Sequence, residues 1–259
     1  MLIEVNALVI RTVDLSESDR LLSLYSAEKG KISAVAKGVR SLKNKAMFGG
    51  QLFCYSRFIL YRKGDKFWVR EAELIEHFYD IRLQLPRTAL ASYVCDVLSD
   101  VATAEPDPAL LRLALNTLHA ISTEKYELSL VKAAFEFRMA ASLGFLPDIS
   151  GCADCGKETG DLVLDLADGI LYCPDCRAAM GEFGQMYPDH EDFRRRIEVL
   201  TPAVRASMQY VAHAPIERLF SFRLADEDKE MFLSVCERYL IYHLERSYRS
   251  LAFYHEVKE

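Results

Sequence analysis

The sequence has no apolar run close to the roughly 20 residues that a membrane-spanning helix needs. It also has no internal repeat and no low-complexity tract, so neither a repeat architecture nor a compositionally biased tail is expected. With 51% hydrophobic and 27% charged residues, the composition is that of an ordinary globular protein. The 259 residues are enough for one large domain or two smaller ones.

Signature motifs of several enzyme classes are missing as well. The sequence contains no G-x4-G-K-[ST] phosphate loop, no G-x-S-x-G, no H-E-x-x-H and no G-x-G-x-x-G. The six histidines are dispersed, and none has neighbours in sequence that would activate a nucleophilic cysteine. We therefore expect isolated structural roles for them and no catalytic activity for the chain. These histidines are His77, His119, His190, His213, His243 and His255.

The N-terminus does not read as a secretion signal, because Glu4 and Arg11 interrupt its apolar stretch and no small-residue cleavage site follows. The chain has seven cysteines, an odd number that does not indicate a complete disulfide framework. Cys54, Cys95 and Cys236 lie among apolar residues and are expected to be buried thiols. Together these features predict a reducing, cytoplasmic environment.

The other four cysteines form two C-x2-C pairs separated by seventeen residues, the spacing of a structural zinc site. Each pair directs two thiolates at one metal, and two pairs complete a tetrahedron with no open position for catalysis. The intervening segment is rich in glycine and too short to form its own core, so one zinc ion per chain would hold it together. Disulfides or free thiols are the alternative. The ligands are Cys152, Cys155, Cys173 and Cys176.

The charge is unevenly distributed along the chain. The net charge is −6, yet residues 29–70 hold eleven basic residues and a single acid, Asp65, which makes this window +10 and the remainder −16. A basic N-terminal part on an otherwise acidic chain indicates a polyanionic partner such as DNA.

The residue pattern predicts an α+β, multidomain chain. Short alternating segments up to about residue 78 predict five strands in a small antiparallel barrel, with Gly64-Asp65 as a two-residue hairpin turn. From about Pro86 the period becomes helical, and Asp107-Pro108 and Thr201-Pro202 are typical helix starts. We expect a barrel over 1–80 and a helical domain over 81–259, with the zinc module inserted at about 150–178. The last helix is expected to begin near Asp226.

The predicted hairpin offers one candidate nucleic-acid surface. A two-residue turn would pair Lys63 with Lys66, Tyr61 with Trp68 and Ile59 with Arg70, and alternation adds residues of the same face. Cations attract phosphates, and aromatic rings stack on bases. An ordinary solvated sheet with cross-strand aromatic pairs is the alternative. The expected face consists of Tyr55, Arg57, Tyr61, Lys63, Lys66, Trp68 and Arg70.

The segment after the third predicted strand is a second candidate surface. It lacks periodicity and carries Lys37, Arg40, Lys43 and Lys45, which could clamp a nucleic-acid backbone or could simply be solvated.

Several stretches in one order resemble the RecO family of bacterial recombination mediators. They are A-L-V-I-R-T-V-D-L-S-E-S-D-R-L-L-S-L-Y-S (Ala7 to Ser26), G-K-I-S-A-V-A-K-G-V-R (Gly30 to Arg40), E-A-E-L-I-E-H-F (Glu71 to Phe78) and F-E-F-R-M-A-A-S-L-G-F-L-P (Phe135 to Pro147), which leads into C-A-D-C. The resemblance covers nearly the whole chain. It implies an N-terminal OB-fold, a helical C-terminal domain and, as in many members, a four-cysteine zinc site.

The resemblance also implies a function without catalysis. Members bind single- and double-stranded DNA, anneal complementary strands, and act with RecR to load RecA onto strands coated by single-stranded-DNA-binding protein (SSB). The acidic C-terminal tail of SSB docks on the helical domain, for which Lys132 and Arg138 are the candidates here. Lys31, Lys37, Arg40 and Lys43 match the barrel pattern of the family. The implied location is the bacterial cytoplasm, at the nucleoid.

Two other classes compete with a DNA-binding mediator. One is an enzyme that uses Cys155 or Cys173 in thiol or zinc chemistry, although four thiolates leave zinc no position for a water. The other is a protein adapter whose basic barrel is incidental.

Overall fold

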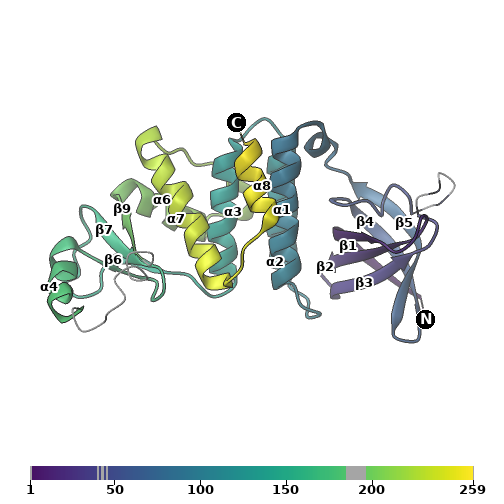
Figure 1. Ribbon diagram of the computed structural model, residues 1–259, viewed down its shortest axis with the longest axis horizontal. Helices are drawn as coiled ribbons and strands as arrows, with labels where there is room; N and C mark the ends of the chain where they lie inside the picture. The colour runs from purple at the N-terminus through teal and green to yellow at the C-terminus, as the bar shows by residue number, and fades with distance from the viewer. Residues whose placement is uncertain (1, 40, 42–43, 45, 185–196, 259) are drawn as a thin grey trace. The chain divides into compact units, whose positions relative to one another are not determined.

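The computed structural model describes residues 2–39, 41, 44, 46–184 and 197–258. The chain folds as two compact units, one of Met1–Leu128 together with Tyr248–Glu259 and one of Ser129–Ser247. Figure 1 labels the helices and strands of both units.

The first unit begins with a closed five-stranded barrel (Figure 1). Its strands follow the order β1-β2-β3-β5-β4 around the barrel, and apolar side chains such as Val9, Leu24 and Phe58 fill the interior. The predicted barrel is confirmed, but the predicted antiparallel pairing of all its strands is wrong, because β3 and β5 pair in parallel. That order agrees with the expected OB-fold, a five-stranded Greek-key barrel. The strands are β1 (Leu2–Asp14), β2 (Arg20–Ser26), β3 (Gly30–Ala36), β4 (Tyr55–Lys63) and β5 (Lys66–Glu76).

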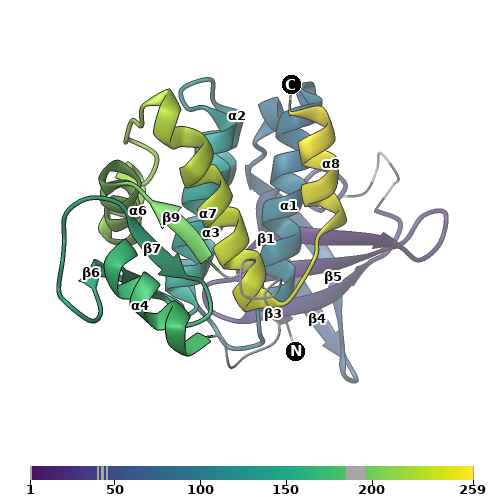
Figure 2. The ribbon, with the colours of Figure 1, turned by 60° about the vertical axis from the view of Figure 1, so that its left-hand side comes forward.

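Helices follow the barrel in the same unit: η1 (Tyr79–Leu83), α1 (Leu85–Val101) and α2 (Pro108–Ser122). The predicted start of α2 is confirmed, because the Asp107 carboxylate accepts hydrogen bonds from the backbone N–H groups of Ala109 and Leu110. The C-terminal helix α8 (Arg249–Val257) lies alongside α1 (Figures 1 and 2). The prediction that the helix beginning near Asp226 is the last one is wrong, because α8 follows it.

The second unit combines helices with a small sheet. Its helical elements are α3 (Leu128–Ser142), α4 (Pro174–Gly184), α6 (Pro202–His213), η2 (Ile216–Arg218) and α7 (Asp226–Leu244). Thr201 caps α6 as predicted, since its hydroxyl accepts the N–H of Val204 at 3.2 Å. The sheet has the order β6-β8-β7-β9 and is built from β6 (Asp148–Cys152), β7 (Leu162–Asp165), β8 (Ile170–Tyr172) and β9 (Ile197–Leu200). Among the described residues, no helix combines the length and apolarity needed to cross a bilayer.

Candidate metal centre and nucleic-acid interface

The structure brings the four paired cysteines together at one end of the small sheet. Cys152 ends β6, Cys173 directly follows β8, and Cys176 lies in the first turn of α4. Their sulfur atoms, with that of Cys155, lie within 4.8 Å of one another. The Cys155 and Cys173 Sγ atoms are 3.7 Å apart. Zn–S bonds of about 2.3 Å in a tetrahedron separate the sulfurs by about 3.8 Å, so this set fits a metal ion.

The local backbone prepares one of these thiols for a metal. Hydrogen bonds from backbone N–H groups lower the pKa of the Cys152 thiol to about 6, and the N–H of Cys155 has the largest effect, followed by that of Cys173. Hydrogen bonds with the thiols of Cys173 and Cys155 raise the pKa of Cys176. Since metal ligands must be thiolates, a metal that binds here displaces the protons that the cluster still holds.

Arg205 supports the loop between the two cysteine pairs, and the sequence pattern does not predict this role. It is buried on α6, and its Nη2 donates to the carbonyl oxygens of Glu158 at 2.8 Å and Gly160 at 3.0 Å. The signal in the sequence is weak, because nothing near Arg205 points to residues more than forty positions away.

The β4–β5 hairpin has the predicted turn. Lys63 pairs with Lys66 and Tyr61 pairs with Trp68, as expected. The expected pairing of Ile59 with Arg70 is wrong, because the register shifts between Ile59 and Leu60 and Ile59 pairs with Glu71. A β-bulge of this kind places two residues of one strand opposite one of the other. Arg70 is exposed at this irregularity.

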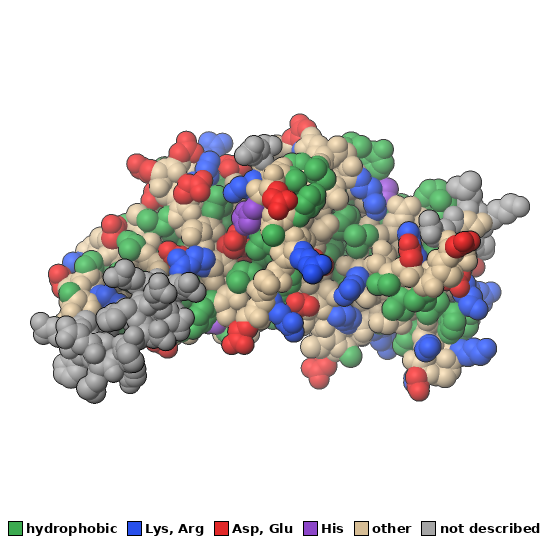
Figure 3. Space-filling model, in the orientation of Figure 1, with side chains coloured by type: hydrophobic (Ala, Val, Ile, Leu, Met, Phe, Trp, Pro, Cys, Tyr) green, Lys and Arg blue, Asp and Glu red, His purple; other side chains and the backbone are tan. Residues whose placement is uncertain are grey.

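Cations and aromatic rings meet at the tip of this hairpin. The rings of Tyr61 and Trp68 stack with centroids 6.4 Å apart and planes 17° from parallel. The ammonium group of Lys37 lies 4.8 Å from the centre of the Trp68 ring. Figure 3 shows basic side chains gathered at this lower end of the barrel. We call Lys37, Tyr61, Lys63, Lys66 and Trp68 the hairpin-tip cluster.

The base of the same hairpin differs from the tip, since carboxylates occupy its outer face. Arg57 forms ion pairs with Glu73 and with Glu4, the latter at 3.7 Å, and the hydrogen bond to Glu73 raises the pKa of Arg57. Tyr55 pairs with Glu76 across the strands. Burial, with a smaller effect from Glu28, raises the pKa of Tyr55. The structure therefore divides the expected face into a basic tip and a base where acids neutralise Arg57.

The remaining barrel candidates lie elsewhere. Lys31 on β3 donates from its ammonium group to the Ser99 carbonyl in the last turn of α1, so part of its charge interacts with that helix end. Arg40, Lys43 and Lys45 lie outside the described residues.

The two candidates on α3 are engaged inside the second unit. Lys132 is 3% exposed and its ammonium group lies 2.9 Å from Glu136 and 2.5 Å from Glu237. Burial opposes its charge, but the two carboxylates outweigh burial and raise the pKa of Lys132. Arg138 is half-buried and donates to the Ala214 carbonyl. Burial lowers the pKa of Arg138.

Family models match almost the whole chain. The model described as "Recombination protein O N terminal" covers residues 1–78, which is the barrel. The model described as "Recombination protein O C terminal" covers residues 82–252. The chain belongs to the RecO family. The resemblance seen in the sequence is thereby confirmed, and so is the expected fold class.

Individual relatives agree with the family models. Three proteins named "DNA repair protein RecO" align over nearly their full length. The protein of Acetivibrio thermocellus is 33% identical over 97% of this chain and 95% of its own length. The protein of Pelotomaculum thermopropionicum is 30% identical over 97% and 93%, and that of Moorella thermoacetica is 28% identical over 99% and 91%, respectively.

Proposed function

We propose that this RecO-family chain is a non-catalytic, DNA-binding recombination mediator in DNA repair. Its relatives carry the name DNA repair protein, and the hairpin-tip cluster is the observation that carries the proposal for this chain. Lys37, Lys63 and Lys66 are exposed and attract phosphates, while the aromatic pair offers a surface for unstacked bases. Single-stranded and double-stranded DNA are both ligands in this proposal, since the cations recognise the phosphate backbone rather than a base sequence.

Annealing of complementary strands follows from the same charges. Cations that screen two phosphate backbones lower the repulsion between them, and strands held close together pair more readily. In this proposal the chain works with RecR to load RecA onto SSB-coated single strands, in the cytoplasm at the nucleoid. Arg138 is the residue we retain for the acidic SSB tail, because its guanidinium contacts the uncharged Ala214 carbonyl and is paired with no carboxylate of the described residues. Lys132 is left out because Glu136 and Glu237 already surround its charge.

The test is a fluorescence titration of a labelled oligo-dT against the full chain at several salt concentrations. We expect binding whose logarithmic affinity falls with the logarithm of salt concentration by about 0.7 for each phosphate contact. Absence of binding at near-physiological salt would favour the protein adapter and overturn the proposal. Adding an acidic SSB-tail peptide to the titration tests the partner assignment separately.

We further propose that the metal at the four cysteines is a single structural zinc ion. Support comes from the sulfur spacing and from a ligand set that is all thiolate, which suits zinc and leaves no open position. Metal analysis with thiol counting tests this. One zinc per chain with four protected thiols is the expected result, whereas a pair that cycles between thiol and disulfide would indicate the thiol enzyme instead.

A further inference from the structure

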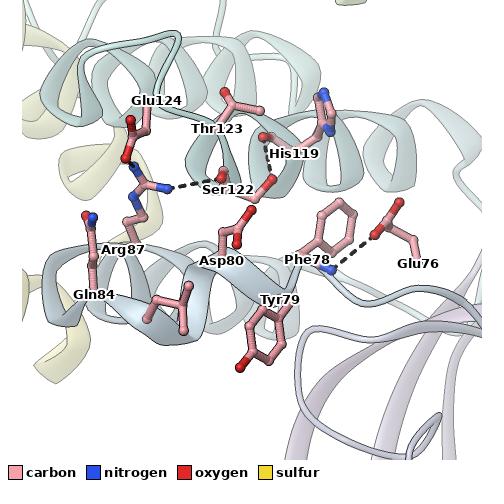
Figure 4. Close-up of a pocket in the computed structure, with 11 residues that line it drawn as sticks. Glu76, Phe78, Tyr79, Asp80, Gln84, Arg87, His119, Ser122, Thr123 and Glu124 are labelled. Carbon is pink, nitrogen blue, oxygen red and sulfur yellow. Dashed lines mark hydrogen bonds and ion pairs between the residues drawn. The ribbon is translucent and has the colours of Figure 1, made fainter.

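A cavity of about 610 Å³ lies in the first unit, where η1 and the start of α1 face the last turn of α2 (Figure 4). It is separate from the hairpin-tip cluster and from the cysteines, since neither contributes a lining residue. The buried ring of Phe78 and the exposed side chain of Leu83 supply apolar lining. Glu76, Asp80 and Glu124 supply carboxylates.

The charge inside the cavity is unbalanced. Arg87 is the cation among the lining residues, and it is already engaged: its Nη1 donates to the Ser122 carbonyl at 3.0 Å and its Nη2 lies 3.6 Å from Glu124. Within the part of the chain that the structure describes, Asp80 forms no ion pair. Figure 4 shows its carboxylate pointing toward the last turn of α2.

The end of α2 adds to this negative character. Carbonyl groups at the C-terminal end of a helix carry a partial negative charge that favours a cation within the last turn. The last turn of α2 contains His119 and no Lys or Arg, and Arg87 of α1 already donates to its Ser122 carbonyl. A positively charged group placed beside Asp80 would therefore meet the full negative charge of that carboxylate, and the helix end would add only the part of its partial charge that Arg87 does not neutralise. A phosphate would be repelled there, which excludes polynucleotide as the occupant.

Exposed apolar side chains flank the lining residues. Ile75 and Leu85 are each next in sequence to a lining residue and are 52% and 55% exposed, and Leu83 is 62% exposed. Apolar side chains exposed next to a polar recess favour a protein-interaction site. A free polyamine carries no apolar side groups to cover them, whereas a protein segment carries both a cation and apolar neighbours.

We propose that this cavity receives a lysine or arginine side chain of a partner protein, with apolar residues of the same segment packing on Ile75, Leu83 and Leu85. The cationic group pairs with the carboxylate of Asp80 in η1, which points toward the last turn of α2 (Figure 4). The aliphatic stem of the incoming side chain lies against Phe78 and Leu83. Glu76 adds a negative charge to the cavity lining, and its Oε1 accepts hydrogen bonds from the backbone N–H groups of His77 and Phe78.

The probe is a blocked peptide, Gly-Leu-Arg-Leu-Gly, titrated into the isotope-labelled full chain and followed by amide chemical shifts. Three comparison ligands separate the contributions: the same peptide with Gln for Arg, the peptide with Ser for both Leu, and spermidine. We expect the Arg peptide to shift residues of η1 and of the last turn of α2 with a Kd below about 5 mM. Each comparison ligand should bind more weakly.

The matched variants are Asp80→Asn and Asp100→Asn. Both remove one exposed carboxylate from the first unit, and Asp100 lies at the far end of α1 from the cavity. We expect Asp80→Asn to weaken the Arg peptide about 3- to 5-fold and Asp100→Asn to leave it unchanged. No shift at about 10 mM peptide would overturn the proposal, as would equal affinities for the two variants. Spermidine binding as tightly as the peptide would overturn the assignment to a protein partner.

Discussion

Basic side chains differ in exposure and in ion pairing between the barrel and the second unit. Lys63 and Lys66 at the hairpin tip are exposed, and within the described residues neither forms an ion pair. Lys132 on α3 is 3% exposed and lies between the carboxylates of Glu136 and Glu237. All three residues are lysines, but the charges of Lys63 and Lys66 are available to a ligand, whereas the charge of Lys132 stabilises the fold.

A count of basic residues therefore does not measure an anion-binding surface. Moving a charge out of water costs several kcal/mol, so a buried lysine is stable only where carboxylates compensate it. An exposed lysine has no such cost and keeps its attraction for phosphate. Arg57 lies between these cases, since it is exposed but paired with Glu73 and Glu4.

The largest expected effect is on stability, from Lys132→Met. The substitution leaves Glu136 fully buried without its cation, and breaking a buried pair in this way costs about 3–5 kcal/mol. Urea unfolding followed by circular dichroism measures it, with the exposed Lys258→Met as the control. Adding Glu136→Gln should recover part of the loss. A change below about 1 kcal/mol in Lys132→Met would contradict the structural role.

A smaller effect, on DNA affinity, is expected from the double variant Lys63→Gln/Lys66→Gln. Two lost phosphate contacts at ~0.1 M salt weaken single-strand binding about 25-fold, because each contact contributes about 0.7 to the logarithmic salt dependence. Anisotropy of a labelled oligo-dT measures the affinity. Lys125→Gln/Lys258→Gln removes the same charge from other exposed positions and should change the affinity far less. Equal losses in both doubles would show that net charge, not the tip, governs binding.

Trp68→Leu is expected to weaken binding about 5-fold, the effect of about 1 kcal/mol from one stacked base. Trp68→Phe keeps an aromatic face and should lose less. Both variants need a melting curve, since Trp68 is half-buried and stacks on Tyr61. Unchanged affinity in a folded Trp68→Leu protein would remove the aromatic pair from the interface.

The smallest effect is expected from Arg57→Gln, about 2-fold or less, because Glu73 and Glu4 already neutralise Arg57. The single variant Lys63→Gln is the partner for comparison, since each removes one exposed cation from β4. If Arg57→Gln weakens DNA binding as much as Lys63→Gln does, the division of the hairpin into tip and base is wrong.

Local features of the fold could be predicted from the sequence because their causes are local. Asp107 and Thr201 cap helices that begin within three residues of them, and Gly64, with a φ of 61°, fits a two-residue turn. The spacing of the four cysteines is enough to predict that they form one cluster. Pairings set by barrel closure could not be seen in this way, and so the parallel β3–β5 pair and the contact of Arg57 with Glu4 of β1 were missed.

The sequence did contain a signal for the burial of Lys132 that was overlooked. Residues 131–137 of α3 are apolar apart from Lys132 and Glu136, and a helix that is apolar on nearly every side lies in a core. Lys132 and Glu136, four residues apart within that run, therefore had to pair with each other. The base of the hairpin carried a signal too, since Glu71, Glu73 and Glu76 follow the basic window directly.

We propose that DNA binds this chain at the tip of the β4–β5 hairpin. The decisive measurement is the slope of logarithmic affinity for oligo-dT against logarithmic salt concentration, in the wild type and in Lys63→Gln/Lys66→Gln. A slope shallower by about 1.4 in the double variant is the predicted result, and parallel lines for the two proteins would contradict it.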